Sequence, residues 1–176
     1  MNITFRYLEN KTCDFKLLYN WCKNEYIFKW FEQRELSFDE IVAKYQKKLN
    51  SKKQDLFIIK YNNHEIGFLQ IYKFENDIDL KCIKKNQNIY EFDLFIGEEK
   101  YLDKGIGTKI VSVVNNMIYS KYNADAIILR PFKRNIRAIR CYEKCGYKIV
   151  DEYRGLDTIN NPEIFLILLN IKKINY

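Results

Sequence analysis

A glycine-bearing turn at the start of an amphipathic helix constrains the fold of this chain most. Gly105 and Gly107 lie in the run 102–109, which leads into a long apolar stripe. The stripe has helical spacing and predicts a helix over residues 104–120 that docks on a sheet. Its members are Ile106, Ile110, Val113, Val114, Met117 and Ile118. No acidic residue follows Asp103 in the first turn, so backbone amides and the helix dipole would favour a bound anion. The alternative is that the two glycines only permit a tight strand-to-helix turn.

Two familiar phosphate loops do not fit this turn. A Walker loop needs four residues between its first glycine and the G-K-[ST] triplet, whereas one residue separates Gly105 from Gly107, and Thr108 then precedes Lys109. A dinucleotide fingerprint needs a third glycine where Ile110 stands. The spacing therefore excludes the standard P-loop and the standard Rossmann turn.

The remaining periodicities predict a mixed α/β (α+β) chain. We expect strands over 2–8, 55–61, 65–74, 89–96 and 125–131 and near 147–153 and 163–169, helices over 12–23, 38–49, 104–120 and 134–145, and a polar loop over 75–88. Ser37 with Glu40 three residues later predicts a capping box, and Asn62-Asn63 predicts a hairpin turn. Hairpins in the first half and βαβ crossovers in the second imply a mixed sheet with helices on both faces.

Length and composition favour one domain over residues 1–176, because the chain has no internal repeat and no Pro/Gly-rich linker. No apolar run approaches ~20 residues, and the first residues do not read as a secretion signal, so we expect a cytoplasmic protein. The net charge of +7 suits polyanions, but no basic stripe with interleaved aromatics occurs. We therefore expect neither a nucleic-acid nor a membrane partner.

The five cysteines are an odd number without framework spacing and favour reduced, mostly buried thiols. Cys141 and Cys145 lie one helical turn apart and could in principle hold a metal ion. The chain has a single histidine, His64, expected in an exposed turn, and it has no C-x-x-C motif. We expect no metal site and no Cys–His nucleophile.

Two further segments contain polar groups that call for an explanation. Asp93 lies in the apolar strand 89–96, where a carboxylate is costly unless it is paired or functional. It either joins a nearby Arg or Lys in a buried network or acts on a substrate. The helix 134–145 begins near Asn135, and Tyr142 follows two turns later on the same side. Tyr142 either packs on the sheet or faces a ligand, and Gly146 reads as the helix stop.

Together, the turn, the strand and the second helix resemble the Gcn5-related N-acetyltransferase (GNAT) superfamily over nearly the whole chain. The resemblance implies a mixed, mostly antiparallel sheet of six to seven strands, splayed where acetyl-CoA binds. It implies that Asn135 hydrogen-bonds the pantetheine arm and that Tyr142, a phenol with pKa near ~10, protonates the departing thiolate. The implied cofactor-binding residues are Leu94, Phe95, Ile96, Lys104, Gly105, Ile106, Gly107, Thr108, Asn135, Ala138 and Tyr142. Leu102 departs from the Gln or Arg that usually stands there.

The runs 93–98, 105–108 and 135–144, with 70–73 on an earlier strand, are similar to the aminoglycoside 6'-N-acetyltransferases. That subfamily implies that Asp93 contacts the acceptor amine and acts as its base. The implied substrate-binding residues are Trp30, Phe31, Gln70, Tyr72, Tyr90, Asp93 and Glu98. Arg130 stands where the subfamily usually has a drug-binding Asp before Pro131, and its permanent charge would repel a polycation. Acidic residues nevertheless gather near the expected acceptor site: Glu75, Asp77, Asp79, Glu91, Glu98 and Glu99.

Three interpretations follow. The first is acetyl transfer from acetyl-CoA to the 6'-amine of an aminoglycoside. The second is a GNAT enzyme for another amine, such as a polyamine, a streptothricin-like compound or a protein N-terminus, which Arg130 favours. The third is a non-enzymatic acyl-CoA-binding or nucleic-acid-binding module, supported only by the basic charge. A small-molecule amine is the expected partner, and the chain is expected to be a monomer or a homodimer.

Overall fold

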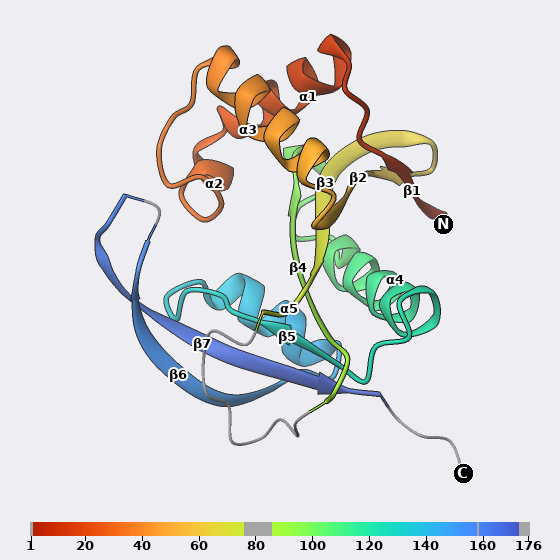
Figure 1. Cartoon of the computed structure of the whole chain (residues 1–176), viewed down its shortest axis with the longest axis vertical. Coiled ribbons are helices and arrows are strands. Elements are labelled where there is room, and N and C mark those ends of the chain that lie inside the picture. The colour runs from red at the N-terminus through yellow and green to blue at the C-terminus, as the bar shows by residue number, and fades with distance from the viewer. Residues whose placement is uncertain (1, 76–85, 158, 173–176) are drawn as a thin grey trace. The chain divides into compact units, whose positions relative to one another are not determined.

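The computed structural model describes residues 2–75, 86–157 and 159–172, and Figure 1 traces its elements along the chain. The strands are β1 (Ile3–Tyr7), β2 (Gln54–Tyr61), β3 (His64–Lys73), β4 (Ile89–Ile96), β5 (Ala126–Leu129), β6 (Lys148–Leu156) and β7 (Pro162–Ile171). The helices are α1 (Thr12–Cys22), α2 (Glu25–Phe28), α3 (Phe38–Ser51), α4 (Ile106–Lys121) and α5 (Ile136–Lys144), with a short 3-10 helix η1 (Glu99–Tyr101). The order confirms the predicted mixed α/β class.

The strands form a seven-stranded sheet in the order β1-β2-β3-β4-β5-β7-β6. β1 pairs antiparallel with β2, and β5 pairs antiparallel with β7. β4 and β5 are parallel, in register from Ile89 opposite Ala126 to Glu91 opposite Ile128. β4 itself continues to Ile96, so residues 92–96 extend beyond this register. The parallel pair among antiparallel neighbours makes the sheet mixed, as the sequence predicts.

The chain divides into two compact units, of which the first comprises Met1–Ile71, Asp93–Lys104 and Leu156–Asn161. Its core joins α1, α3 and the β2–β3 hairpin, and Leu18, Ile41, Tyr45, Ile58 and Phe68 are completely buried there. Helix α3 begins at the predicted capping box, in which Ser37 accepts from the Glu40 amide and Glu40 accepts from the Ser37 amide. This cap fixes the start of the helix that carries Lys44 and Lys48, both discussed below.

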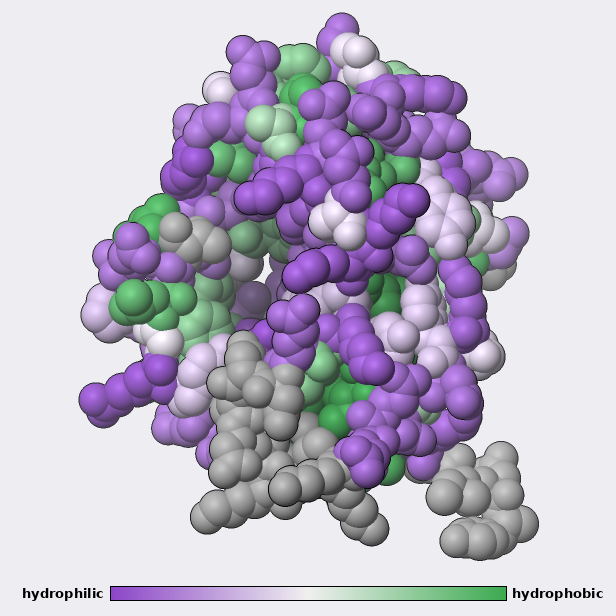
Figure 2. Space-filling model, viewed as in Figure 1, coloured by the Kyte–Doolittle hydropathy of each residue, from purple (hydrophilic) through white to green (hydrophobic). Residues whose placement is uncertain are grey.

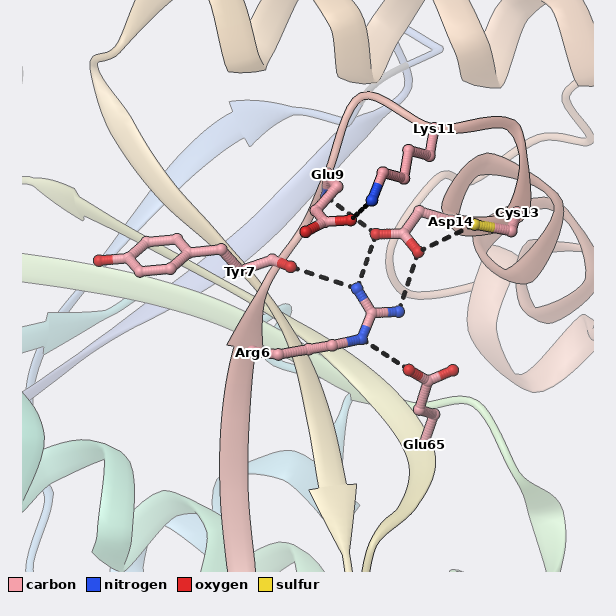
Figure 3. A network of polar contacts seen from close by, with 7 residues as sticks. All are labelled: Arg6, Tyr7, Glu9, Lys11, Cys13, Asp14 and Glu65. Carbon is pink, nitrogen blue, oxygen red and sulfur yellow. Dashed lines mark hydrogen bonds and ion pairs between the residues drawn. The ribbon is translucent and has the colours of Figure 1, made fainter.

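A network of polar contacts around Arg6 ties β1 to the start of α1 within this unit (Figure 3). The guanidinium donates to both oxygens of the buried Asp14, at 2.7 and 2.9 Å, and to Glu65 at 2.6 Å. Burial opposes ionisation of Asp14, but the hydrogen bonds from Arg6 and from the Glu9 amide prevail and lower the pKa of this carboxyl. Asp14 therefore stays charged inside the unit because its partner is a forked cation.

The second unit comprises Tyr72–Phe92, Gly105–Gly155 and Pro162–Tyr176. Helix α4 buries a face that agrees with the predicted stripe at Ile106, Ile110, Val114 and Ile118, while Val113 and Met117 are only half-buried. Val111 and Asn115 take the remaining buried positions of that face, and Asn115 accepts a hydrogen bond of 2.7 Å from the Tyr147 hydroxyl. Helix α5, by contrast, buries only Ile139.

Hydrophilic residues cover most of the face that α1 and α3 present in Figure 2. Large apolar side chains are exposed along the edge strand β6, at Ile149, Val150 and Leu156. Among the described helices, none combines the length and apolar content that a membrane crossing requires.

Most predicted boundaries are within a few residues of the observed ones, and the hairpin turn is confirmed by the positive φ of Asn62 and Asn63 (47° and 66°). Helices α2 and η1, which are four and three residues long, are too short to show a periodic signal and were not predicted. Most of the predicted polar loop 75–88 lies outside the described residues, including Asp77, Asp79 and Cys82.

The expectation of mostly buried thiols is wrong. Of the four described cysteines, Cys22 is buried, Cys13 is exposed, and Cys141 and Cys145 are half-buried. The latter two lie on or next to α5, and a helix that buries so little of its surface leaves them partly accessible.

Candidate active site

The glycine turn is the N-terminus of α4. Gly105 is the N-cap residue with φ +71°, a left-handed conformation that residues with a Cβ rarely adopt. The helix begins at Ile106, two residues later than predicted, so the exposed Lys104 belongs to the preceding turn. The first turn contains no acidic residue. Because the first amides of a helix have no intrahelical acceptor, those of residues 106–108 are donors suited to a phosphate.

Helix α5 carries the second predicted segment. Asn135 is its N-cap, and the side-chain Oδ1 accepts from the Ala138 amide at 3.2 Å. Gly146 follows the C-cap with φ +88°, which confirms it as the helix stop. The half-buried Tyr142 lies edge-on to Phe92, with ring centroids 6.4 Å apart, and 5.9 Å from Tyr147. Aromatic packing thus orients the phenol that the resemblance marks as the acid.

The glycine turn and α5 contact each other through Thr108. The Thr108 hydroxyl lies 3.6 Å from Cys141 Sγ, and the Cys145 thiol donates to the Thr108 carbonyl at 3.3 Å. The two segments that the sequence singled out are therefore neighbours in the second unit, although 33 residues separate Thr108 from Cys141.

Strand β4 carries the carboxylate that the sequence left unexplained. Asp93 is half-buried, and its Oδ2 accepts from Gln70 Nε2 at 2.6 Å. Gln70 Oε1 in turn accepts from Lys48 Nζ at 2.6 Å. An amide thus lies between the carboxylate and the ammonium, and a chain of three polar side chains extends from α3 through β3 to β4. Sequence reasoning had named Asp93 and Gln70 but had missed Lys48.

A positional signal for Lys48 does exist in the sequence. Ile41, Tyr45 and Lys48 have the i, i+4, i+7 spacing of one helix face, and the first two are completely buried. A lysine on that face is desolvated, and burial followed by repulsion from Lys44 lowers the pKa of Lys48 to about 8, against the attraction of Asp93 and Glu32. Lys44 itself is paired with the buried Glu32.

The other side chains predicted to bind the acceptor have mostly structural contacts. Phe31 packs edge-on against Phe68 and Phe95, with centroids 6.0 and 4.9 Å away. Glu98 accepts from the Trp21 indole at 3.0 Å, and the Tyr90 ring lies 5.0 Å from that of Tyr122. Trp30 and Tyr72 are half-buried.

The side chains of residues 94–96, which are predicted to bind the acetyl donor, differ in burial. Phe95 is buried, while Leu94 and Ile96 are half-buried. The role that the resemblance implies for residues 94–96 belongs to backbone amides, which lie beyond the β4–β5 register.

Arg130 does not present an uncompensated charge, which corrects the sequence-based interpretation. Its Nε and Nη2 donate to the two carboxylate oxygens of Glu91 at 2.7 and 2.8 Å. Glu91 is 3% exposed. The repulsion expected of Arg130 toward a cationic acceptor is therefore offset by a bidentate ion pair, and Glu91 is not available to attract that acceptor.

Residues 10–154 match the family described as an acetyltransferase (GNAT) domain. The chain belongs to this family. As a GNAT acetyltransferase it is an enzyme, and the acetyl donor of GNAT enzymes is acetyl-CoA. Among the described residues, no cluster of three or more His, Cys, Asp or Glu side chains could hold a metal ion.

Two curated relatives and one solved structure illustrate the similarity. An aminoglycoside N(6')-acetyltransferase type 1 of Klebsiella pneumoniae is 24% identical over 159 residues, covering 88% of this chain and 77% of the relative. A spermidine N(1)-acetyltransferase of Vibrio cholerae is 25% identical over 147 residues, covering 82% and 78%. The structure of AAC(6')-Ib in complex with paromomycin and acetyl-CoA has a TM-score of 0.80 at 22% identity, covering 98% and 94% of the two chains. The GNAT acetyltransferase thus has relatives that act on two kinds of amine.

Proposed function

We propose that this GNAT acetyltransferase transfers the acetyl group of acetyl-CoA to the 6'-amine of an aminoglycoside. The observation that carries the proposal is the hydrogen bond from Gln70 to Asp93. Both residues belong to the acceptor set implied by the resemblance, and the contact holds the carboxylate in one orientation on β4. The curated aminoglycoside relative, which covers most of this chain, supports the same acceptor class.

The residues of the second unit suit the donor. The αL N-cap Gly105 and the acid-free first turn of α4 leave the amides of residues 106–108 and the exposed Lys104 to bind a diphosphate. The Oδ1 of Asn135 caps α5, so its amide NH₂ is the group that would donate to the pantetheine arm. Acetyl-CoA supplies an activated thioester carbonyl. The amides near Leu94 and Phe95 on β4 would donate to that carbonyl oxygen as it becomes negative.

Two side chains would then transfer protons, one as general base and one as general acid. Asp93 accepts a proton from the acceptor ammonium, directly or through water, and so makes the amine nucleophilic. Gln70 keeps one carboxylate oxygen in place for this step. Tyr142, held by the aromatic contact with Phe92, gives its proton to the leaving sulfur. No protein nucleophile is needed, so transfer is direct and no acetyl-enzyme forms.

The second candidate is acetylation of another amine, such as a polyamine. Two observations favour it: Arg130 stands where a drug-binding Asp is usual, and the spermidine acetyltransferase relative is as similar as the aminoglycoside one.

The proposal also includes the domain organisation and the place of action. Residues 10–154 run through both compact units and form one acetyltransferase domain. The chain acts in the cytoplasm on a small-molecule amine, as a monomer or homodimer.

The test is an acceptor panel in which release of the CoA thiol is measured against a blank without acceptor. Neomycin and paromomycin differ in bearing an amine or a hydroxyl at the 6' position, so they form a matched pair; kanamycin, spermidine and a peptide complete the panel. The proposal predicts turnover with neomycin and kanamycin and none with paromomycin. Turnover with spermidine alone would establish the second candidate. Equal turnover with neomycin and paromomycin would overturn the 6' assignment.

A further inference from the structure

Two thiols lie against the turn proposed to bind the donor diphosphate. Cys141 is on the last turn of α5, and Cys145 is its C-cap residue, one helical turn later. Cys141 Sγ lies 3.6 Å from the Thr108 hydroxyl, and the Cys145 thiol donates to the Thr108 carbonyl at 3.3 Å. Both cysteines are half-buried, so neither lies in the closed core of the unit. Neither thiol has a part in the proposed transfer reaction.

The pair has the spacing that a disulfide requires. Positions i and i+4 of a helix place their Cα atoms about 6 Å apart, inside the range found in disulfides. Cys145 has φ −94° and ψ 12° and lies just past the last helical residue, Lys144. Closing a bridge therefore needs adjustment at the helix end and not in its middle.

The two thiols also differ chemically. The neighbouring Cys145 thiol, aided by the Thr108 hydroxyl and the charges of Lys144 and Arg137, outweighs burial and lowers the pKa of Cys141. The neighbouring Cys141, with burial, raises the pKa of Cys145. Of the two, Cys141 is therefore the thiol that ionises more readily, and Cys145 is the one that holds its proton more tightly. A thiolate beside a second thiol is the usual arrangement of a peroxide-reactive cysteine and its resolving partner.

We propose that Cys141 and Cys145 form a modification site for peroxides, with Cys141 as the attacking thiol and Cys145 as the resolving thiol. The Cys141 thiolate attacks one peroxide oxygen, the O–O bond breaks, and hydroxide or alkoxide leaves with a protein sulfenic acid remaining. The Cys145 sulfur then attacks the sulfenic sulfur, its proton goes to the departing oxygen, and water leaves. Two thiols are thereby oxidised to one disulfide and one peroxide is reduced, so the step balances.

The bridge would change the proposed donor site through Thr108. The Cys145 thiol loses its proton on oxidation, so its hydrogen bond to the Thr108 carbonyl disappears, and a disulfide sulfur is a weaker acceptor for the Thr108 hydroxyl than a thiolate is. Thr108 lies in the first turn of α4, whose amides are proposed to bind the diphosphate. We expect the affinity for acetyl-CoA to fall several-fold on oxidation and to recover on reduction. This second part rests on the proposed function, whereas the disulfide itself does not.

Trypsin provides a direct test, because Lys144 lies between the two cysteines. The whole chain is treated with hydrogen peroxide, unreacted thiols are alkylated, and the digest is analysed by mass spectrometry. We expect peptides 141–144 and 145–148 to appear joined by a disulfide. The exposed Cys13 and the buried Cys22 are internal controls that should be alkylated as thiols or remain unreacted.

Two variants separate the roles of the thiols. Cys145→Ser, which keeps a hydroxyl at this position, should stop at a sulfenic acid on residue 141, which dimedone traps, and Cys141→Ser should give no linked peptide. Absence of the linked peptides from the native chain, or oxidation of Cys13 before Cys141, would overturn the proposal.

Calorimetry with acetyl-CoA on reduced, oxidised and re-reduced protein tests the second part. An unchanged affinity after quantitative disulfide formation would overturn the coupling to the donor site. No binding by the reduced chain would instead overturn the proposed donor site, and the peptide mapping would still decide whether the modification site exists.

Discussion

Strand β4 carries two carboxylates two residues apart, which differ in burial and in hydrogen-bond partner. Glu91 is buried and forms a bidentate ion pair with Arg130. Asp93 is half-buried and accepts its hydrogen bond from Gln70, a neutral amide. The first carboxylate is neutralised directly by a forked cation, as Asp14 is by Arg6. The second is oriented by a neutral amide and is the carboxylate proposed to take a proton from the acceptor. This contrast separates a structural acid from a candidate base.

The contrast also changes the meaning of Arg130. Seen alone, a guanidinium in place of a drug-binding Asp argues against a cationic acceptor. In the structure its charge is balanced by Glu91, and the cation linked to Asp93 is Lys48, through Gln70. Lys48, the cation linked to Asp93 through Gln70, can lose its proton, whereas an arginine cannot.

The largest expected effect comes from replacing Asp93, the proposed catalytic base. Asp93→Asn keeps the shape and the hydrogen-bonding partner but cannot accept the ammonium proton, so kcat should fall about 10²-fold or more. Steady-state kinetics with the best acceptor measures this, with thermal unfolding to check the fold. Asp39→Asn, an exposed change in the first turn of α3, is the matched control. Unchanged turnover of Asp93→Asn would make this carboxylate another structural acid.

Breaking the ion pair should instead affect stability. Arg130→Met removes the bidentate cationic partner of the buried Glu91, and we expect the free energy of unfolding to fall by about 3 kcal/mol. Urea denaturation is measured for Arg130→Met and for the double variant Arg130→Met/Glu91→Leu. The comparison distinguishes a loss of packing from the cost of a buried charge that has lost its partner. The double variant should regain most of the loss, because it buries no charge. Equal instability of both variants would contradict this account.

Phe92, the residue between the two carboxylates, contacts Tyr142, which allows a test of the proposed acid. Tyr142→Phe preserves the ring packing and removes the proton, so kcat should fall about tenfold or more while acetyl-CoA affinity changes little. Initial rates and calorimetry measure the two quantities separately. If affinity fell and kcat did not, Tyr142 would be a binding residue only.

The smallest expected effect sharpens the role of Lys48. Its pKa is lowered to about 8 in the folded chain, so between pH 8 and its ordinary value the unfolded chain binds more protons. The free energy of unfolding contributed by this residue should therefore rise with pH across that window, by less than the full shift implies because Lys48 is only half-buried. Lys48→Met should remove the rise. Chemical denaturation of both proteins from pH 7 to 10 gives the difference, in which contributions of other groups cancel. Parallel pH profiles would show that Lys48 is not desolvated.

Local pattern was enough to predict much of the fold. The capping box at Ser37, the turn at Asn62-Asn63 and the bounds of β4 depend on neighbouring residues, and all are confirmed. The short elements α2 and η1 were missed because four or three residues do not establish a helical period. The position of Lys48 on the buried face of α3 could be predicted from helical spacing. A lysine in such a pattern is nevertheless easily assumed to be solvent-exposed.

By itself, the sequence determined the order of elements, the glycine turn that opens α4 and the chemical character of Asp93, Asn135 and Tyr142, since these depend on periodicity and on residue type. The tertiary structure alone decided which charges are paired. Arg130 meets Glu91 across 39 residues and Lys48 meets Gln70 across 22, and strand register and helix docking bring them together. Such contacts leave no periodic trace in the sequence, because the free energy of an ion pair or hydrogen bond depends on distance in space and on burial, and not on separation along the chain.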